Sequence, residues 1–260
     1  MIFESNTADF QLSNSVLGFS GHKIKQNRER ILSHGSILRI TRDSLRVLIY
    51  HNPAVMDYHL PQDSVGVHFT STGMTFGLAD GVSLVHKTLD NDSAVLSHHI
   101  VLRCNRLSGA YWPKQLDDVC TQFTSRNYIG SSTVVWGRIE NESATTKLKT
   151  LLVGEQYDMG ITRLITTKGL IEISNASSGF IPNGYKPSTE ELFLPTPYTL
   201  CISSDGVDFS DRAWSEFSQY QLFNEPLESV ADFLSQTIEP NRDDQSLLIV
   251  STSDKENSVL

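Results

Sequence analysis

The chain has 260 residues, 39% of them hydrophobic and 20% charged, which suits a globular protein with a full hydrophobic core. Its formal net charge of −9 disfavours non-specific binding to nucleic acid or to an anionic membrane surface. No apolar run reaches the roughly 18 residues of a membrane-spanning helix, and the N-terminus lacks a basic region followed by a long apolar stretch. We therefore expect a cytoplasmic protein that binds neither nucleic acid nor membrane, and we expect it to be monomeric.

Alternating apolar residues predict strands through most of the chain. Residues 1–35 are polar and poorly periodic, whereas residues 36–50 alternate on both sides of a polar turn and predict a hairpin. Further strands are predicted at residues 65–70, 74–79, 132–137, 149–153, 161–166, 170–173, 198–203 and 247–251. Residues 174–190 are rich in Ser, Gly, Pro and Asn and predict a surface loop, and residues 253–260 predict a disordered tail.

Three segments have helical spacing instead. The apolar faces are Leu96, Ile100, Cys104 and Leu107 in the first, Leu116, Val119, Cys120 and Phe123 in the second, and Leu227, Val230, Ala231 and Leu234 in the third. Pro113 and Pro226 open the second and third helices. The cysteines have no metal-type or pairable spacing and are expected in the core. Strand groups separated by helices predict an α+β fold of two packed sheets with helices outside.

Four aspartates stand at ends of predicted strands, each in a short polar frame. The frames are Gln62-Asp63-Ser64, Ala79-Asp80-Gly81-Val82, Ser204-Asp205-Gly206-Val207 and Asp243-Asp244-Gln245-Ser246. Taken singly, an Asp-Gly pair indicates an ordinary turn more often than a ligand. Four carboxylates at one point, however, would repel one another strongly unless cations lay between them. Hard divalent ions such as Mg²⁺ or Mn²⁺ are the usual partners of such acids.

The order of these frames resembles that of metal-dependent serine/threonine protein phosphatases of the protein phosphatase 2C (PPM) type. The matching segments are residues 62–63 with 75–82, 130–135, 157–158, 200–207 and 243–247. The resemblance identifies the chain as a small divergent member. It implies a four-layer αββα sandwich of two antiparallel sheets flanked by helix pairs. The phosphatase domain would span residues 51–252, with residues 1–50 as an N-terminal extension packed on or near it.

The same resemblance implies a two-metal site. Asp80 would bridge two Mg²⁺ or Mn²⁺ ions, and the carbonyl of Gly81 would ligate the first. Asp205 and Asp244 would hold the second ion, and Asp63 would hold or orient metal-bound water, so that Asp63 and Asp80 are the catalytic residues. Water activated between the two ions would hydrolyse phosphoserine or phosphothreonine on a protein that a kinase has modified. Whether a third ion binds is left open.

Two choices of register underlie this assignment. The family ligand directly precedes an amide, which is Gln245 in this chain, and this selects Asp244 over Asp243. The competing first frame at residues 27–29 lies too far from Asp80, whereas Asp63 leaves room for two short strands and a turn.

The chain also departs from the family pattern. In the family the Asp-Gly pair is usually followed by one variable residue and two glycines, which are Ser83 and Leu84 here. Residues 56–60 hold no phosphate-binding arginine, although His59 or Tyr58 could substitute. Between Phe123 and Trp136 there is no acidic residue that could hold a third metal. Asp158 is given a structural role, and His98 and His99 point to different helix faces. Two other functions remain open: a pseudophosphatase that binds partners on the same fold, and a phosphohydrolase of small molecules.

Overall fold

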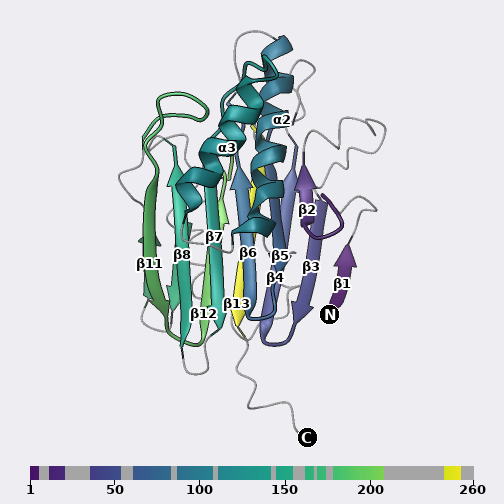
Figure 1. Ribbon diagram of the computed structural model, residues 1–260. Helices are drawn as coiled ribbons and strands as arrows, with labels where there is room; N and C mark the ends of the chain where they lie inside the picture. Colours follow the sequence, from purple (N-terminus) through teal and green to yellow (C-terminus); the bar gives the residue numbers. More distant parts are fainter. Residues whose placement is uncertain are drawn as a thin grey trace, which may run out of the picture.

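The computed structural model describes residues 1–5, 12–20, 36–53, 61–82, 87–107, 111–141, 145–154, 162–166, 169–173, 178–207 and 243–252. In these residues two antiparallel sheets pack face to face, and two α-helices cover the outer face of one sheet (Figure 1). The α+β class with two antiparallel sheets is confirmed.

The first sheet joins the two ends of the described chain. Its seven strands are, in spatial order, β1 (Ile2–Ser5), β3 (Ser36–Arg42), β4 (Leu45–Asn52), β13 (Gln245–Thr252), β12 (Tyr198–Ser203), β9 (Thr162–Thr166) and β10 (Gly169–Ile173). The predicted hairpin at residues 36–50 forms β3 and β4. Strand β4 pairs with β13 along its whole length, from Leu45 opposite Thr252 to Asn52 opposite Gln245. Residues of the expected N-terminal extension thus lie beside the last strand.

The second sheet has six strands. In spatial order they are β11 (Ser188–Leu194), β8 (Thr146–Val153), β7 (Val134–Asn141), β6 (Gly73–Ala79), β5 (Ser64–Phe69) and β2 (Leu17–Ser20). Three strands of the two sheets were not predicted from the sequence. Strands β1 and β2 lie within residues 1–35, and β11 begins inside the expected loop at residues 174–190. Strands β1 and β2 are too short to display alternation, and β11 is a polar edge strand that the ladder with β8 specifies.

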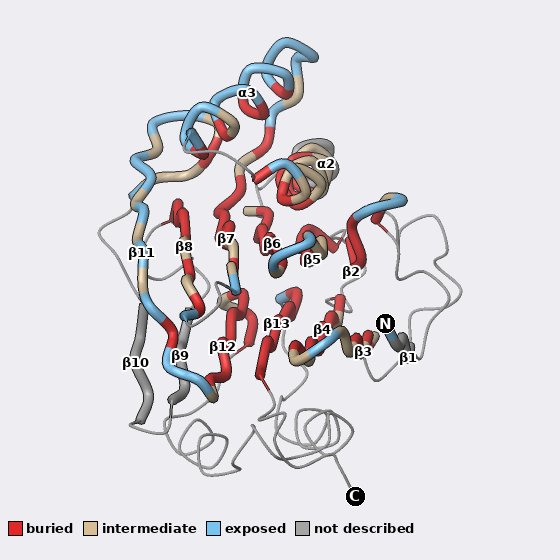
Figure 2. Tube along the Cα trace, turned by 60° about the horizontal axis from the view of Figure 1, so that its bottom comes forward, coloured by how far each residue is buried: buried red, intermediate tan, exposed pale blue. Residues whose placement is uncertain are grey.

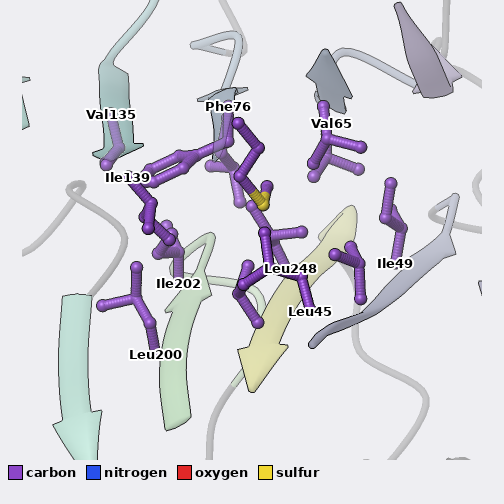
Figure 3. Close-up of a cluster of buried hydrophobic side chains, with 14 of the residues drawn as sticks. Leu45, Ile49, Val65, Phe76, Val135, Ile139, Leu200, Ile202 and Leu248 are labelled. Atoms are coloured by element: carbon purple, nitrogen blue, oxygen red, sulfur yellow. The ribbon is translucent and has the colours of Figure 1, made fainter. Parts of the chain in front are cut away.

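Apolar side chains from both sheets form the main core. Figure 3 shows Val65, Phe76 and Ile139 of the six-stranded sheet facing Ile49 and Leu248 of the seven-stranded sheet. This is the period-two alternation expected of sheets with one face buried against each other.

Packing inside this core requires a glycine on β7. Gly137 pairs with Phe76, and a Cβ atom built on Gly137 would lie 1.7 Å from Cζ of that ring. A side chain at Gly137 would therefore displace Phe76 from the core.

The helices pack on the six-stranded sheet as their spacing predicts (Figure 2). Helix α2 (Lys87–Arg103) continues into a 3₁₀ turn (Cys104–Arg106), and α3 is Trp112–Thr124 with its proline in the first turn. All eight apolar residues predicted for these two helical faces are buried in a second cluster. Trp136 of β7 anchors α2, because its indole N–H donates to the carbonyl of Ile100 at 3.1 Å.

The outer face of the seven-stranded sheet is also buried. It carries Leu48, Tyr50, Cys201, Leu247 and Ile249, which alternate with the residues of the main core. The helix expected to begin at Pro226 and the expected tail lie outside the described residues. No helix in the described part of the chain is long and apolar enough to cross a membrane.

Candidate active site

The four predicted aspartates lie at strand ends in both sheets. Asp63 directly precedes β5 and Asp80 directly follows β6, and the pairing of Ser64 with Ala79 places these two acids together at one end of the hairpin. In the other sheet, Asp244 directly precedes β13 and Asp205 follows β12. Each sheet therefore supplies two carboxylates from one pair of neighbouring strands.

Hydrogen bonds connect the two pairs of acids across the sheets. Oδ2 of Asp244 accepts from the backbone N–H of Gln62, and from that of Asp63 at 3.3 Å. The side chain of Asp63 is hydrogen-bonded to those of Ser204 and Asp80, and Asp80 is in turn hydrogen-bonded to Asp205. The structure thus brings all four predicted acids together.

Burial and mutual repulsion make Asp63 and Asp80 difficult to ionise. Asp63, Asp80 and Asp244 are 1%, 9% and 5% exposed. Burial raises the pKa of Asp63 well above its ordinary value, and the charge of Asp244 raises it further, while hydrogen bonds from Ser204 and Asp80 offset part of the shift. Burial likewise raises the pKa of Asp80, followed by the charges of Asp63 and Asp205. A cation bound between these carboxylates would stabilise their ionised forms.

The donor chemistry suits a hard divalent cation. Buried oxygens Oδ2 of Asp63 and Oδ1 of Asp205 have no hydrogen-bond partner among the described residues. Carboxylate oxygens of this kind are the preferred ligands of Mg²⁺ and Mn²⁺. Among the described residues, however, no group of three His, Cys, Asp or Glu is already arranged to hold a metal ion. The acids meet as hydrogen-bonded pairs, and a coordination sphere would require their side chains to turn.

The backbone around Asp80 is held by a segment that precedes β7. The carbonyl of Asp80 accepts from the N–H of Thr133 and from Oγ of Ser132, both at 2.8 Å. Gly81 forms a bridge to Ser132, and a Cβ atom on Gly81 would lie 2.7 Å from Cβ of Gln62. The residue expected to ligate through its carbonyl therefore lies where no side chain fits.

The Asp205 turn packs equally closely on the strand that carries Asp244. A Cβ atom on Gly206 would lie 2.0 Å from the carbonyl oxygen of Asp244, and Nε2 of Gln245 donates to the carbonyl of Gly206 at 3.2 Å. Ser204 also fixes this region, because its N–H donates to the carbonyl of Ser246 at 2.8 Å and its Oγ accepts from the N–H of Ser246 at 2.9 Å. The turn and the strand are held as one unit.

Several of these supporting residues were not singled out from the sequence. They are Ser132, Ser204 and Ser246, which are buried polar residues at the ends of apolar strands. The available signal was their position, because Ser204 and Ser246 stand inside the aspartate frames and Ser132 stands in the matched segment at residues 130–135. Asp243, which the sequence analysis set aside as a ligand, accepts from the backbone N–H of Asp244 at 2.9 Å and so shapes the turn.

The loop before β11 is linked to the acid cluster through Ser132. Ile181 exchanges both backbone hydrogen bonds with Ser132, each at 3.0 Å, and Ser132 also contacts the carbonyl of Asp80. Farther along the loop, the hydroxyl of Tyr185 donates to Asp117 of α3. The loop therefore spans from the outer helix to the segment that supports Asp80.

The remaining candidates stay outside the cluster or outside the described residues. The rings of His98 and His99 lie edge to face with 5.8 Å between their centroids, and Nδ1 of His98 lies 3.1 Å from Oγ of Ser20. The cysteines are buried and unpaired by disulfides, as expected of core residues. Residues 27–29, Tyr58, His59 and Asp158 lie outside the described residues.

Solved structures of other proteins share this fold, and phosphatases are among them. RsbX in complex with magnesium superposes with a TM-score of 0.63 and 14% sequence identity, over 84% of this chain and 100% of that chain. A bacterial serine phosphatase gives a TM-score of 0.62 at 14% identity, over 80% and 98%. The catalytic domain of PstP, a serine/threonine protein phosphatase, in complex with two manganese ions gives 0.55 at 14% identity, over 81% and 99%. The likeness covers most of the chain and shows that the fold is that of these phosphatases.

Sequence comparison, by contrast, finds no match: no protein-family model and no curated protein matches the chain.

Proposed function

We propose that the chain is a metal-dependent serine/threonine protein phosphatase of the protein phosphatase 2C type. One observation carries the proposal: four aspartates from both sheets meet at one point of a phosphatase-like fold, and two of them have raised pKa values through burial and mutual repulsion. Such a cluster is stable in its ionised form only with cations bound, because each unpaired buried carboxylate raises the free energy of the folded state.

The residues would divide the site between two ions. Asp80 would bridge them, the Gly81 carbonyl would complete the first site, and Asp205 with Asp244 would form the second. Asp63 would orient the attacking water. Two Mg²⁺ or Mn²⁺ ions bound there would supply a nucleophilic water near neutral pH and neutralise the phosphoryl oxygens.

The chain prepares this site through its backbone. Donors from Gln62 and Asp63 hold Asp244, and donors from Ser132 and Thr133 hold the carbonyl of Asp80. The bonds to the Asp80 carbonyl fix the main chain and those to Asp244 fix its carboxylate, while the bonds of Asp63 and Asp205 to Asp80 join carboxyl groups only. Ion binding would therefore exchange acid–acid hydrogen bonds for metal ligation without moving a strand.

The proposal also includes the full layer architecture, the domain bounds, the substrate and the cellular location. The buried outer face of the seven-stranded sheet needs a covering layer, and the amphipathic segment from Pro226 is the candidate for it, which would complete a four-layer αββα sandwich. Residues 51–252 would form the phosphatase domain, to which residues 1–50 add strands. The substrate would be a phosphoprotein made by a serine/threonine kinase, in cytoplasmic signalling.

Hydrolysis of an aryl phosphate tests the proposal. Wild-type protein should be active with Mn²⁺ and inactive with EDTA. Asp80→Asn should lose at least about a hundredfold in turnover, because Asp80 would contact both ions, whereas Asp118→Asn, the same change at an exposed position of α3, should keep wild-type turnover. Absence of Mn²⁺-dependent turnover would favour a pseudophosphatase instead.

Substrate class is tested separately. Phosphoserine and phosphothreonine peptides should be hydrolysed with higher kcat/KM than a panel of phosphorylated metabolites. The opposite ranking would indicate a small-molecule phosphohydrolase with the same metal chemistry.

A further inference from the structure

A second concave site lies on the outer helical layer, away from the acids. It is a pocket of about 280 Å³ between the C-terminal half of α2, the 3₁₀ turn and the C-terminal half of α3. Its lining includes Arg103, Arg106 and Arg126 together with His99. No acidic residue belongs to this lining, although the chain as a whole carries a net charge of −9. The pocket therefore concentrates positive charge on a negative protein.

The arginines are placed to receive an anion. Nη2 of Arg103 donates to Oε1 of Gln122 at 3.0 Å, which holds the half-buried Arg103 guanidinium against α3. Among the described residues, neither Arg103 nor Arg126 forms an ion pair with a carboxylate. An arginine with open donor positions binds phosphate or carboxylate through paired, charge-assisted hydrogen bonds.

The remaining lining is mixed: it has three polar residues (Ser13, Asn105, Gln122) and an apolar, partly aromatic part (Leu102, Val119, Phe123, Tyr128). Val119 and Phe123 are buried side chains of α3, and the rings of Phe123 and Tyr128 lie 5.3 Å apart. An inorganic anion would leave this surface unused, whereas a planar organic group would pack on it. The volume of about 280 Å³ lies just below the usual range of ligand pockets, so the occupant must be one small molecule.

The pocket and the acid cluster contact different parts of α2. Ser93 and Ser97 in the middle of α2 bond to Val82 and Ser132, on the side of the acids. The pocket begins at His99 and continues past the end of the helix to Arg106. Occupation of the pocket therefore does not require the metals or the phosphatase chemistry.

We propose that this pocket binds a small organic phosphate, with its phosphate on Arg103 and Arg126 and its planar body on the half-buried ring of Tyr128. The site goes beyond the proposed phosphatase activity, because the bound phosphate lies outside the acid cluster and is not a substrate there.

Calorimetric titration of the full chain in EDTA tests this site, because removing divalent ions removes the acid cluster as a second place for phosphate to bind. The probe is AMP, and adenosine and inorganic phosphate supply its two halves separately. AMP should bind at least tenfold more tightly than either half. Arg103→Ala and Arg126→Ala should each weaken AMP binding about tenfold or more, because each removes a charge-assisted contact. Lys114→Ala removes a positive charge from the same helix outside the pocket lining and should leave the affinity unchanged.

Three results would overturn the proposal: no AMP binding at millimolar concentration, equal affinity for phosphate and AMP, or unchanged affinity in both arginine variants. Melting curves of the variants establish that they fold. The outcome is independent of the phosphatase assay, because Asp80→Asn should bind AMP as the wild type does.

Discussion

Protonation of His51 should destabilise the folded protein between neutral pH and pH 5. His51 lies on β4, is fully buried, and is stacked against Phe19 with 6.2 Å between ring centroids. Its Nδ1 lies 2.9 Å from Oγ of Ser246, and its Nε2 has no hydrogen-bond partner among the described residues. A charged imidazolium at this position would be buried with one N–H unsatisfied.

Burial lowers the pKa of His51 from 6.5 to about 4. Between these values the unfolded chain binds a proton that the folded chain excludes, so the stabilisation is present above pH 6.5 and is lost as the pH falls towards 4. The whole effect corresponds to about 3 kcal/mol, and about 2 kcal/mol of it falls between pH 7 and pH 5. The raised pKa values of Asp63 and Asp80 act in the opposite direction, because their folded forms gain protons as the pH falls.

Urea unfolding of the EDTA-treated protein at both pH values measures this difference. The contribution of the acids is common to wild type and His51→Asn, so it cancels when their losses are compared. We expect wild type to lose about 2 kcal/mol more than His51→Asn on going from pH 7 to pH 5. His68→Asn, at a partly exposed histidine, should keep the wild-type loss because His51 is intact. Equal losses in wild type and His51→Asn would refute the reasoning.

Three further predictions concern the acid cluster. Asp80→Asn should raise the free energy of unfolding of the metal-free protein at pH 7 while removing Mn²⁺ stabilisation, because a repulsive buried carboxylate is lost; a melting temperature that still rises with Mn²⁺ as in wild type would contradict this. Gly206→Ala should destabilise the protein by about 2 kcal/mol and weaken Mn²⁺ binding, since the new methyl group would lie 2.0 Å from the carbonyl oxygen of Asp244. Urea unfolding and Mn²⁺ titration measure the two effects. Unchanged stability would mean that the turn is not tightly packed. Shortening the loop at residues 182–184 should reduce turnover of a phosphoprotein more than turnover of an aryl phosphate. The reason is that the loop is linked to the acid cluster by its hydrogen bonds to Ser132 but carries no proposed metal ligand. Equal losses on both substrates would show that the loop supports the fold or the metals.

The elements and the acid candidates could be predicted because their signals are local. Alternation marked β3 and β4, and helical spacing marked the buried faces of α2 and α3, since burial on one face repeats with the period of the element. The aspartate frames were visible because each acid is adjacent to the end of an apolar strand. Strand β11 was missed because its polar residues carry no such period, and only the ladder with β8 specifies it.

Tertiary structure decided which distant segments meet. No local pattern indicates that β4 pairs with β13, or that Asp244 accepts hydrogen bonds from Gln62 and Asp63 of the other sheet. The arginine pocket arises in the same way, because the 3₁₀ turn and the end of α3 bring Arg106 and Arg126 to one concavity. The sequence by itself determined the periods of the elements and the chemistry of the acids, whereas long-range pairing and packing placed those acids and arginines at shared sites.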